Sequence, residues 1–362
     1  MIASFSETDN RVNWRQVGAF VALTFGLTWA LDAAIALTVG YRSPAFVLLL
    51  QLQMLMPAFS AILLGSFFFT DSPIYRRVPL GSPRHFFTFF LVYTIIYMIL
   101  GWASIAAPQQ SQLFSTLGLA LTILGLLFIL LLRVRGGRQQ FGTAGLAGGN
   151  PRYWLLFGVA VLLFYSFQTL LNSLLGLGHP ADLSALTGQT GMSDSVLLLI
   201  AAVQSVVVGP LIALPIAFGE EYGWRGYLQG ELVKLGKMRG VLLVGTIWGL
   251  WHAPIIAMGH NYPGHPVEGI LLMVAYCIGL GYFLGFAVLK SGSVWLAAFL
   301  HGLNNQALGY LSGLINTPND PVYSFGVGIY GMVPLAIVTL LILRDHVWKE
   351  STRAGTVSSQ LS

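Results

Sequence analysis

Apolar segments of about 20 residues follow one another along most of the chain, and this pattern limits the possible folds more than any other feature. A helix of about 20 apolar residues crosses the hydrocarbon core of a bilayer. Only 9% of the residues are charged, against about 25% in soluble proteins. We therefore expect an all-α, polytopic transmembrane helix bundle, a multi-pass protein of the cell membrane. The ten expected spans are 16–39, 46–70, 86–107, 113–132, 154–175, 195–218, 240–259, 269–289, 294–313 and 325–343.

Lysine and arginine are unevenly distributed between the connections, which indicates the orientation of the spans. Of the 18 basic residues, 17 lie in the termini or in every second connection, and Arg42 alone lies in the other set. Basic connections face the cytoplasm, so both termini are expected there. Because these residues are scattered over short loops and form no basic stripe, the net charge of +5 does not indicate nucleic-acid binding.

The chain divides into three expected parts. Residues 1–150 comprise four N-terminal spans and the glycine-rich cytoplasmic link 134–150, residues 151–345 form a membrane core, and residues 346–362 form a disordered cytoplasmic tail. The outer connection 176–194 is expected to be irregular. With Cys277 as the single cysteine, neither a disulfide nor a cysteine-rich metal site is expected.

Two adjacent acids and an arginine end a long apolar run within the stretch 218–227. Glu220 and Glu221 point about 100° apart on a helix, so they cannot share one role. Glu221 and Arg225 are four residues apart with the acid first, which is the favourable order for an ion pair on one face. Glu220 would then face another direction and be free for chemistry. A carboxylate at membrane depth is energetically costly and indicates a functional site.

The segment 240–259 contributes a histidine beside a helix breaker. Trp248 and His252 are four residues apart, so the indole covers the side of the helix that carries the imidazole. Pro254 lacks the donor that would bond the carbonyl of residue 250, and this opens the backbone beside the histidine. Taken alone, His252 is also typical of a hydrogen-bonded packing residue.

The segment 294–313 contributes a second histidine and two amides. His301 and Asn305 are four residues apart and share one face of the helix. Asn304 is rotated by about 100° from Asn305, toward a neighbouring helix. Alone, this pair is also typical of hydrogen bonding between helices.

Together, the three segments present a carboxylate, two imidazoles and a carboxamide that could converge on one water molecule. A carboxylate held away from water binds its proton more tightly and suits general-base chemistry near neutral pH. One histidine can share or relay that proton. The other histidine and the amide could stabilise the charge that develops on a carbonyl oxygen.

At these segments the chain resembles the type II CAAX prenyl protease family and its bacterial relatives, the CPBP (Abi) intramembrane proteases. The family pattern is Glu-Glu-x-x-x-Arg, Phe-x-x-x-His and His-x-x-x-Asn/Asp, each on its own transmembrane helix. The chain has Glu220-Glu221-Tyr-Gly-Trp-Arg225, Trp248-x-x-x-His252 and His301-Gly-Leu-Asn-Asn305, and the resemblance covers roughly residues 195–310. Tryptophan stands where the family usually has phenylalanine, and we expect this exchange to affect the shape of the pocket more than the chemistry.

The resemblance implies an intramembrane endopeptidase that cleaves a membrane-associated or lipidated peptide or protein. Residues 151–345 would be its catalytic core, with the lipid bilayer and a peptide or protein substrate as partners and without a cofactor. Glu220 and His252 would activate water, and His301 and Asn305 would form the oxyanion site. Glu221, Arg225 and Trp248 would support this arrangement.

Two alternatives stay open. Glu220, His252 and His301 could supply a zinc site of two histidines and one carboxylate with an open position. The metal-free version is favoured because Asn305 suits an oxyanion site and is a poor zinc ligand. A non-enzymatic membrane scaffold, immunity protein or transporter could instead use the polar cluster to join helices, although the sequence lacks the paired broken helices typical of transporters.

Overall fold

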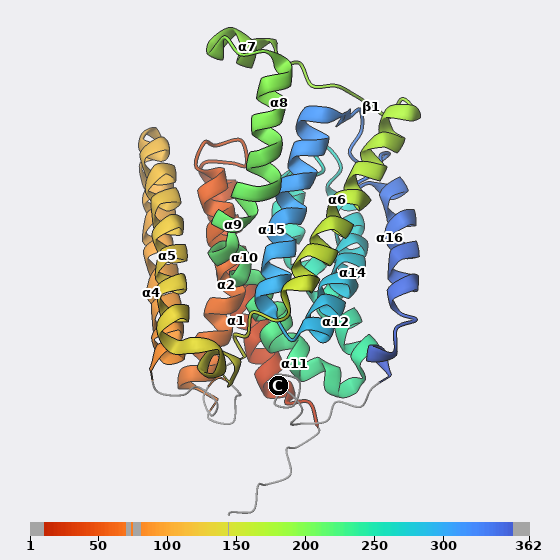
Figure 1. The fold of residues 1–362 in the computed structure, drawn as a ribbon. Coiled ribbons are helices and arrows are strands. Elements are labelled where there is room, and N and C mark those ends of the chain that lie inside the picture. The colour runs from red at the N-terminus through yellow and green to blue at the C-terminus, as the bar shows by residue number, and fades with distance from the viewer. Residues whose placement is uncertain (1–10, 70–73, 75–80, 144, 350–362) are drawn as a thin grey trace, which may run out of the picture.

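The computed structural model describes residues 11–69, 74, 81–143 and 145–349. Long helices run side by side in one bundle, with the hairpin of α4 (Ser82–Ala106) and α5 (Ser111–Thr143) at one edge and α16 (Ile329–Ile342) at the other (Figure 1). The expected all-α class is confirmed. The strands found among the described residues are β1 (Gly178–His179) and β2 (Thr317–Pro318), an antiparallel pair of two residues each.

The remaining elements are these. Up to residue 212 they are α1 (Trp14–Leu37), α2 (Phe46–Phe67), η1 (Pro108–Gln110), α6 (Pro151–Leu174), α7 (Ser184–Thr190), α8 (Asp194–Val203), the π-helical turn η2 (Gln204–Val208) and α9 (Gly209–Ile212). Beyond residue 212 they are α10 (Leu214–Glu221), the π-helical η3 (Tyr222–Leu228), α11 (Gln229–Leu232), η4 (Val233–Leu235), α12 (Lys237–Trp251), α13 (Ala253–Ala257), α14 (Pro266–Ser291), α15 (Val294–Tyr310), the π-helical η5 (Leu311–Ile315) and η6 (His346–Trp348).

Seven helical segments in the described part of the chain are long and apolar enough to cross a membrane. The expected number of ten spans and the cytoplasmic location of both termini stay predictions. The seven segments are 14–37, 46–67, 82–106, 108–137, 151–174, 194–212 and 266–291.

Two of the expected spans form helices that are shorter than predicted. α12 has 15 residues, and α16 is an apolar helix of 14. α12 ends because Pro254 cannot continue its hydrogen bonding, and His252 forms the junction with α13. The predicted opening of the backbone beside His252 is therefore confirmed.

Two of the expected connections contain helix, and one of them, 176–194, was expected to be irregular. α5 continues through residues 134–143 of the expected link, past a kink at Gly137 where φ is 67° and ψ is 173°. Glycine adopts this backbone conformation because it lacks a Cβ, and Nη1 of Arg133 donates to the Gly137 carbonyl at 2.9 Å. In the outer connection 176–194, residues Ser184–Thr190 form α7.

The expectation of disorder from residue 346 onward is wrong for the first residues of that segment. His346–Trp348 form η6, and the side chains of Val347 and Trp348 are buried. The Trp348 ring stacks on Phe286 of α14 at a centroid distance of 6.1 Å, and apolar burial of this kind orders a chain end. The rest of the expected tail, residues 350–362, lies outside the described residues.

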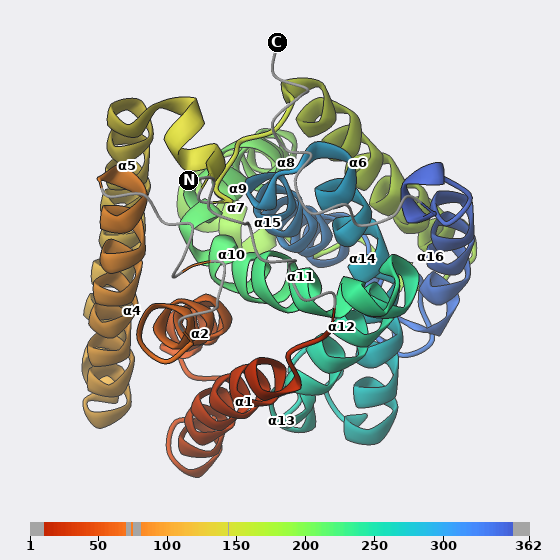
Figure 2. The same ribbon diagram turned by 90° about the horizontal axis from the view of Figure 1, so that it is seen from below.

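α10 lies in the interior of the bundle, packed between α2 and α15 (Figure 2). Gly219 on α10 and Gly223 on the adjoining η3 allow α2 to approach closely. A Cβ on Gly219 would lie 2.7 Å from Cα of Leu55, and a Cβ on Gly223 would lie 2.6 Å from the carbonyl carbon of Pro57. Small residues at such contacts let two helix backbones come together. The N-terminal helix α2 thus packs directly against the element that carries Glu220 and Glu221.

Substitution of Gly219 by alanine should destabilise the protein by about 1–3 kcal/mol, because the added methyl group forces α2 and α10 apart. The measurement is thermal unfolding in detergent followed by circular dichroism. Gly230→Ala on α11 is the matched control, since no neighbouring atom lies within 4 Å of a Cβ at that position. Equal melting temperatures for the two variants would contradict the close packing of α2 on α10.

Candidate functional site

Glu221 accepts hydrogen bonds from two elements on one carboxylate oxygen. Its Oε1 lies 3.0 Å from Nη1 of Arg225 on η3 and 2.8 Å from Nδ1 of His301 on α15. All three side chains are buried. The predicted ion pair between Glu221 and Arg225 is therefore present. Because Nδ1 of His301 donates to Glu221, its Nε2 is the ring nitrogen left for another partner.

Glu220 faces a different helix, as its rotation from Glu221 predicts. Its Oε2 accepts the indole Nε1–H of Trp248 on α12 at 2.6 Å. Glu220 is 3% exposed and Trp248 is 2% exposed. The other oxygen of Glu220, Oε1, makes no hydrogen bond within the described part of the chain. This oxygen is not fully buried and keeps some accessible surface. His301 is close enough to Glu220 to interact with it electrostatically.

His252 lies at the junction of α12 and α13, and its imidazole is oriented by the same tryptophan. Its Nδ1 lies 2.9 Å from the backbone carbonyl of Trp248. A carbonyl only accepts, so Nδ1 carries the hydrogen and Nε2 of the neutral ring carries a lone pair. The ring also packs edge-on against Trp251, with the centroids 4.7 Å apart. Among the described residues no hydrogen bond joins His252 directly to Glu220, and Trp248 contacts both.

The Trp248 ring is enclosed by charged and aromatic groups. The guanidinium carbon of Arg225 lies 4.1 Å from the ring centroid, which is a cation–π contact. The imidazole of His301 meets the ring edge-on at 5.5 Å, and that of His252 lies at 5.8 Å. Trp248 therefore connects the acid of α10 with both histidines.

The two adjacent amides of α15 have different environments. Asn304 is 2% exposed, whereas Asn305 is exposed. Oδ1 of Asn304 lies 2.5 Å from the hydroxyl of Tyr165 on α6 and 3.0 Å from that of Tyr276 on α14, which confirms its predicted rotation toward neighbouring helices. Nδ2 of Asn304 donates to Oδ1 of Asn305 at 3.0 Å. The two tyrosines lie outside the three motifs, and a lone hydroxyl in an apolar span gives no sequence signal of its partner.

Residues 202–307 match the family model described as type II CAAX prenyl endopeptidase Rce1-like. This range contains Glu220, Glu221, Arg225, Trp248, His252, His301 and Asn305. The resemblance inferred from the three motifs is thus confirmed over this range, and the protein is a multi-pass integral membrane protein. Comparisons with curated proteins and with solved structures give no match.

The zinc alternative requires Glu220, His252 and His301 to lie together as ligands, and the structure does not group them in this way. Within the described ranges, no three His, Cys, Asp or Glu side chains are placed to hold a metal ion together. Oε2 of Glu220 is bonded to Trp248, and Nδ1 of His301 is bonded to Glu221. These bonds leave Oε1 of Glu220 and Nε2 of each histidine without a hydrogen bond among the described residues, but the three side chains do not form a set of ligands around one point.

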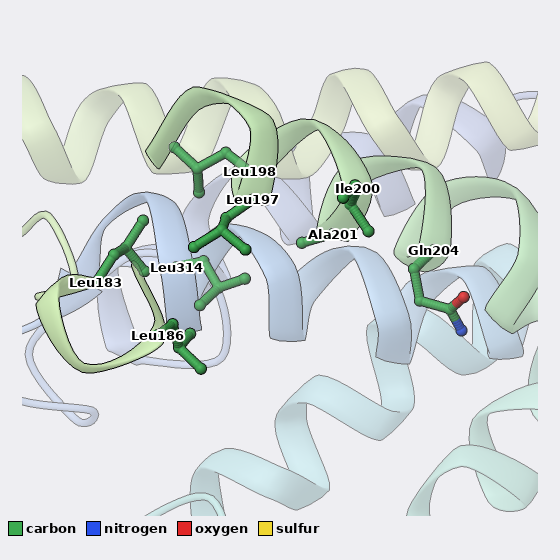
Figure 3. Close-up of a pocket in the computed structure, with 8 residues that line it drawn as sticks. All are labelled: Leu183, Leu186, Leu197, Leu198, Ile200, Ala201, Gln204 and Leu314. Atoms are coloured by element: carbon green, nitrogen blue, oxygen red, sulfur yellow. The ribbon is translucent and has the colours of Figure 1, made fainter. Parts of the chain in front are cut away.

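An apolar cavity of about 250 Å³ lies elsewhere in the protein, between α7, α8, η2 and η5 (Figure 3). None of its lining residues belongs to the polar cluster around Trp248. The cavity is thus separate from the proposed reaction centre. It is lined by Leu183, Leu186, Leu197, Leu198, Ile200, Ala201, Gln204 and Leu314.

Replacement of Arg225 by methionine should destabilise the protein by about 3–5 kcal/mol, because the Glu221 charge then stays buried without its cation. Adding Glu221→Gln to this variant should recover part of the loss, since a neutral amide needs no counter-charge. The free energy of unfolding in detergent measures both effects. The buried ion pair would be contradicted if the double variant lost as much free energy of unfolding as the Arg225→Met and Glu221→Gln single variants lose in sum, or more.

Proposed function

We propose that this protein is an intramembrane endopeptidase that activates water with its own side chains. The observation that most supports this is the placement of Glu220, a buried acid bonded at one oxygen by Trp248 and next to His301. These residues lie in the segment that matches a family of endopeptidases. The proposed substrate is a membrane-associated or lipidated peptide or protein, which would reach the site from the bilayer.

In the proposed reaction, Glu220 is the general base. With Oε2 held by Trp248, Oε1 is the oxygen available to a water molecule. Nε2 of His252 carries a lone pair because Nδ1 donates to the Trp248 carbonyl, so His252 accepts a second hydrogen bond from the same water. A water bonded to two acceptors is oriented with its own lone pair toward the scissile carbonyl carbon.

His301 and Asn305 form the proposed oxyanion site. When His301 is protonated on both nitrogens, Nδ1 donates to Glu221 and Nε2 is free to donate to the developing oxyanion. Oδ1 of Asn305 accepts from Asn304, so the Nδ2 hydrogens of Asn305 are its free donors. Fixed donors of this kind stabilise the tetrahedral intermediate more than the planar substrate.

The proton is conserved through the proposed reaction. The water oxygen bonds to the carbonyl carbon while its proton passes to Glu220. The C–N bond then breaks, and Glu220 returns the proton to the leaving amine nitrogen. Glu221 and Arg225 take no proton in this scheme, and their ion pair holds His301 in place.

Glu220→Gln should reduce the rate of peptide cleavage by roughly 10²- to 10⁴-fold, because the amide fills the same space but cannot accept the proton of water. The assay uses purified protein in liposomes and an internally quenched, farnesylated Cys-a-a-X peptide. A peptidomic comparison of cells that carry either form extends the test to native substrates. Glu231→Gln is the matched control, since this acid pairs with Lys234 on the adjoining segment, away from Trp248.

Two outcomes would change the assignment. Cleavage by Glu220→Gln at the wild-type rate, or identical peptidomes, would favour the scaffold, immunity-protein or transporter alternative. A strong chelator added to the same assay should leave the wild-type rate unchanged. Loss of cleavage that zinc restores would instead favour the metal-dependent version.

A further inference from the structure

Trp248 is the position at which this chain departs from the family pattern, and it makes a contact that phenylalanine cannot make. Its Nε1–H donates to Oε2 of Glu220 at 2.6 Å. Its backbone carbonyl accepts Nδ1–H of His252 at 2.9 Å. One residue of α12 thus contacts both members of the proposed water-activating pair, although α10 and α12 are separated in sequence by η3, α11 and η4.

The packing around Trp248 fixes the direction of its N–H group. The ring is 2% exposed, the Arg225 guanidinium covers its face at 4.1 Å, and His301 meets it edge-on at 5.5 Å. A side chain restrained on several sides can direct a hydrogen bond without reorganising during the reaction. Oε2 of Glu220 is therefore held on a rigid donor.

We propose that Trp248 is a positioning residue for the reaction proposed above, on which this inference rests. Its indole N–H holds Oε2 of Glu220 and so aims Oε1 at the water that His252 also binds. The tryptophan therefore supplies a directed donor to the chemistry, in addition to the pocket shape expected from the sequence. A role in packing alone would depend on the size of the ring and not on its N–H.

Two substitutions separate the donor from the ring. Trp248→Phe keeps a large aromatic ring beside Arg225 and removes the donor. Trp248→His keeps a five-membered ring whose Nε2 occupies the same position in the ring as the indole Nε1, so the donor remains while bulk is lost. We expect Trp248→Phe to lower kcat roughly 10- to 100-fold with little change in KM, as for loss of a hydrogen bond to a charged group. Trp248→His should retain more of kcat than Trp248→Phe.

The assay is cleavage of the farnesylated peptide in liposomes, with kcat and KM determined separately. Trp251→Phe is the matched control, because it also removes an indole donor from α12. The indole of Trp251 donates to the Thr28 hydroxyl at 2.9 Å and not to Glu220. Its kcat is expected to fall less than that of Trp248→Phe. If Trp248→His does not fold, the comparison of Trp248→Phe with Trp251→Phe decides.

The outcomes distinguish this inference from the proposed function. An inactive Glu220→Gln variant together with a Trp248→Phe variant of wild-type kcat would overturn the positioning role alone. A kcat for Trp248→Phe equal to or above that of Trp248→His would overturn it as well, since ring size would then matter more than the donor. An active Glu220→Gln variant would overturn the proposed function and this inference together.

Discussion

Charged side chains in the interior of an apolar bundle need hydrogen-bond partners, and each of the two adjacent acids of α10 has a partner from a distant part of the chain. Glu220 is bonded by the indole of Trp248 on α12, and Glu221 is bonded by Arg225 on η3 and by His301 on α15. These hydrogen bonds connect α10 with α12, η3 and α15, which carry the other residues of the three motifs. The rotation of about 100° between neighbouring helix positions assigns one acid to each set of partners. The proposed division of labour between the base and its supporting ion pair follows from that rotation.

The first half of the chain holds this centre in place, although it contains none of the three motifs. α2 packs so closely on α10 and η3 that there is no room for a side chain at Gly219 or Gly223. Asp32 of α1 is bonded to Gln53 of α2, which joins the first two helices inside the bundle. On α6, Tyr165 bonds Asn304. The N-terminal helices are thus part of the packing that positions the site.

Local features of the site could be predicted from the sequence, and contacts between distant helices could not. The ion pair of Glu221 with Arg225 follows from their spacing on one helix, and the break at His252 follows from Pro254. The bond from Trp248 to Glu220 was missed because spacing along the chain says nothing about which helices are neighbours. For the same reason, the sequence predicted that Asn304 points toward a neighbouring helix but not that it bonds two tyrosines there.

The residues at which the helices end could not be predicted from the sequence pattern either. The lengths of the apolar segments predicted one span over residues 240–259, but Pro254 ends α12 at Trp251. Elsewhere, π-helical turns interrupt or extend helices. An experimental structure in lipid, at a resolution that shows ordered water, tests the central claim most directly. We expect one water within hydrogen-bond distance of both Oε1 of Glu220 and Nε2 of His252. A separation of these two atoms well beyond about 6 Å, too long for one bridging water, would contradict the account.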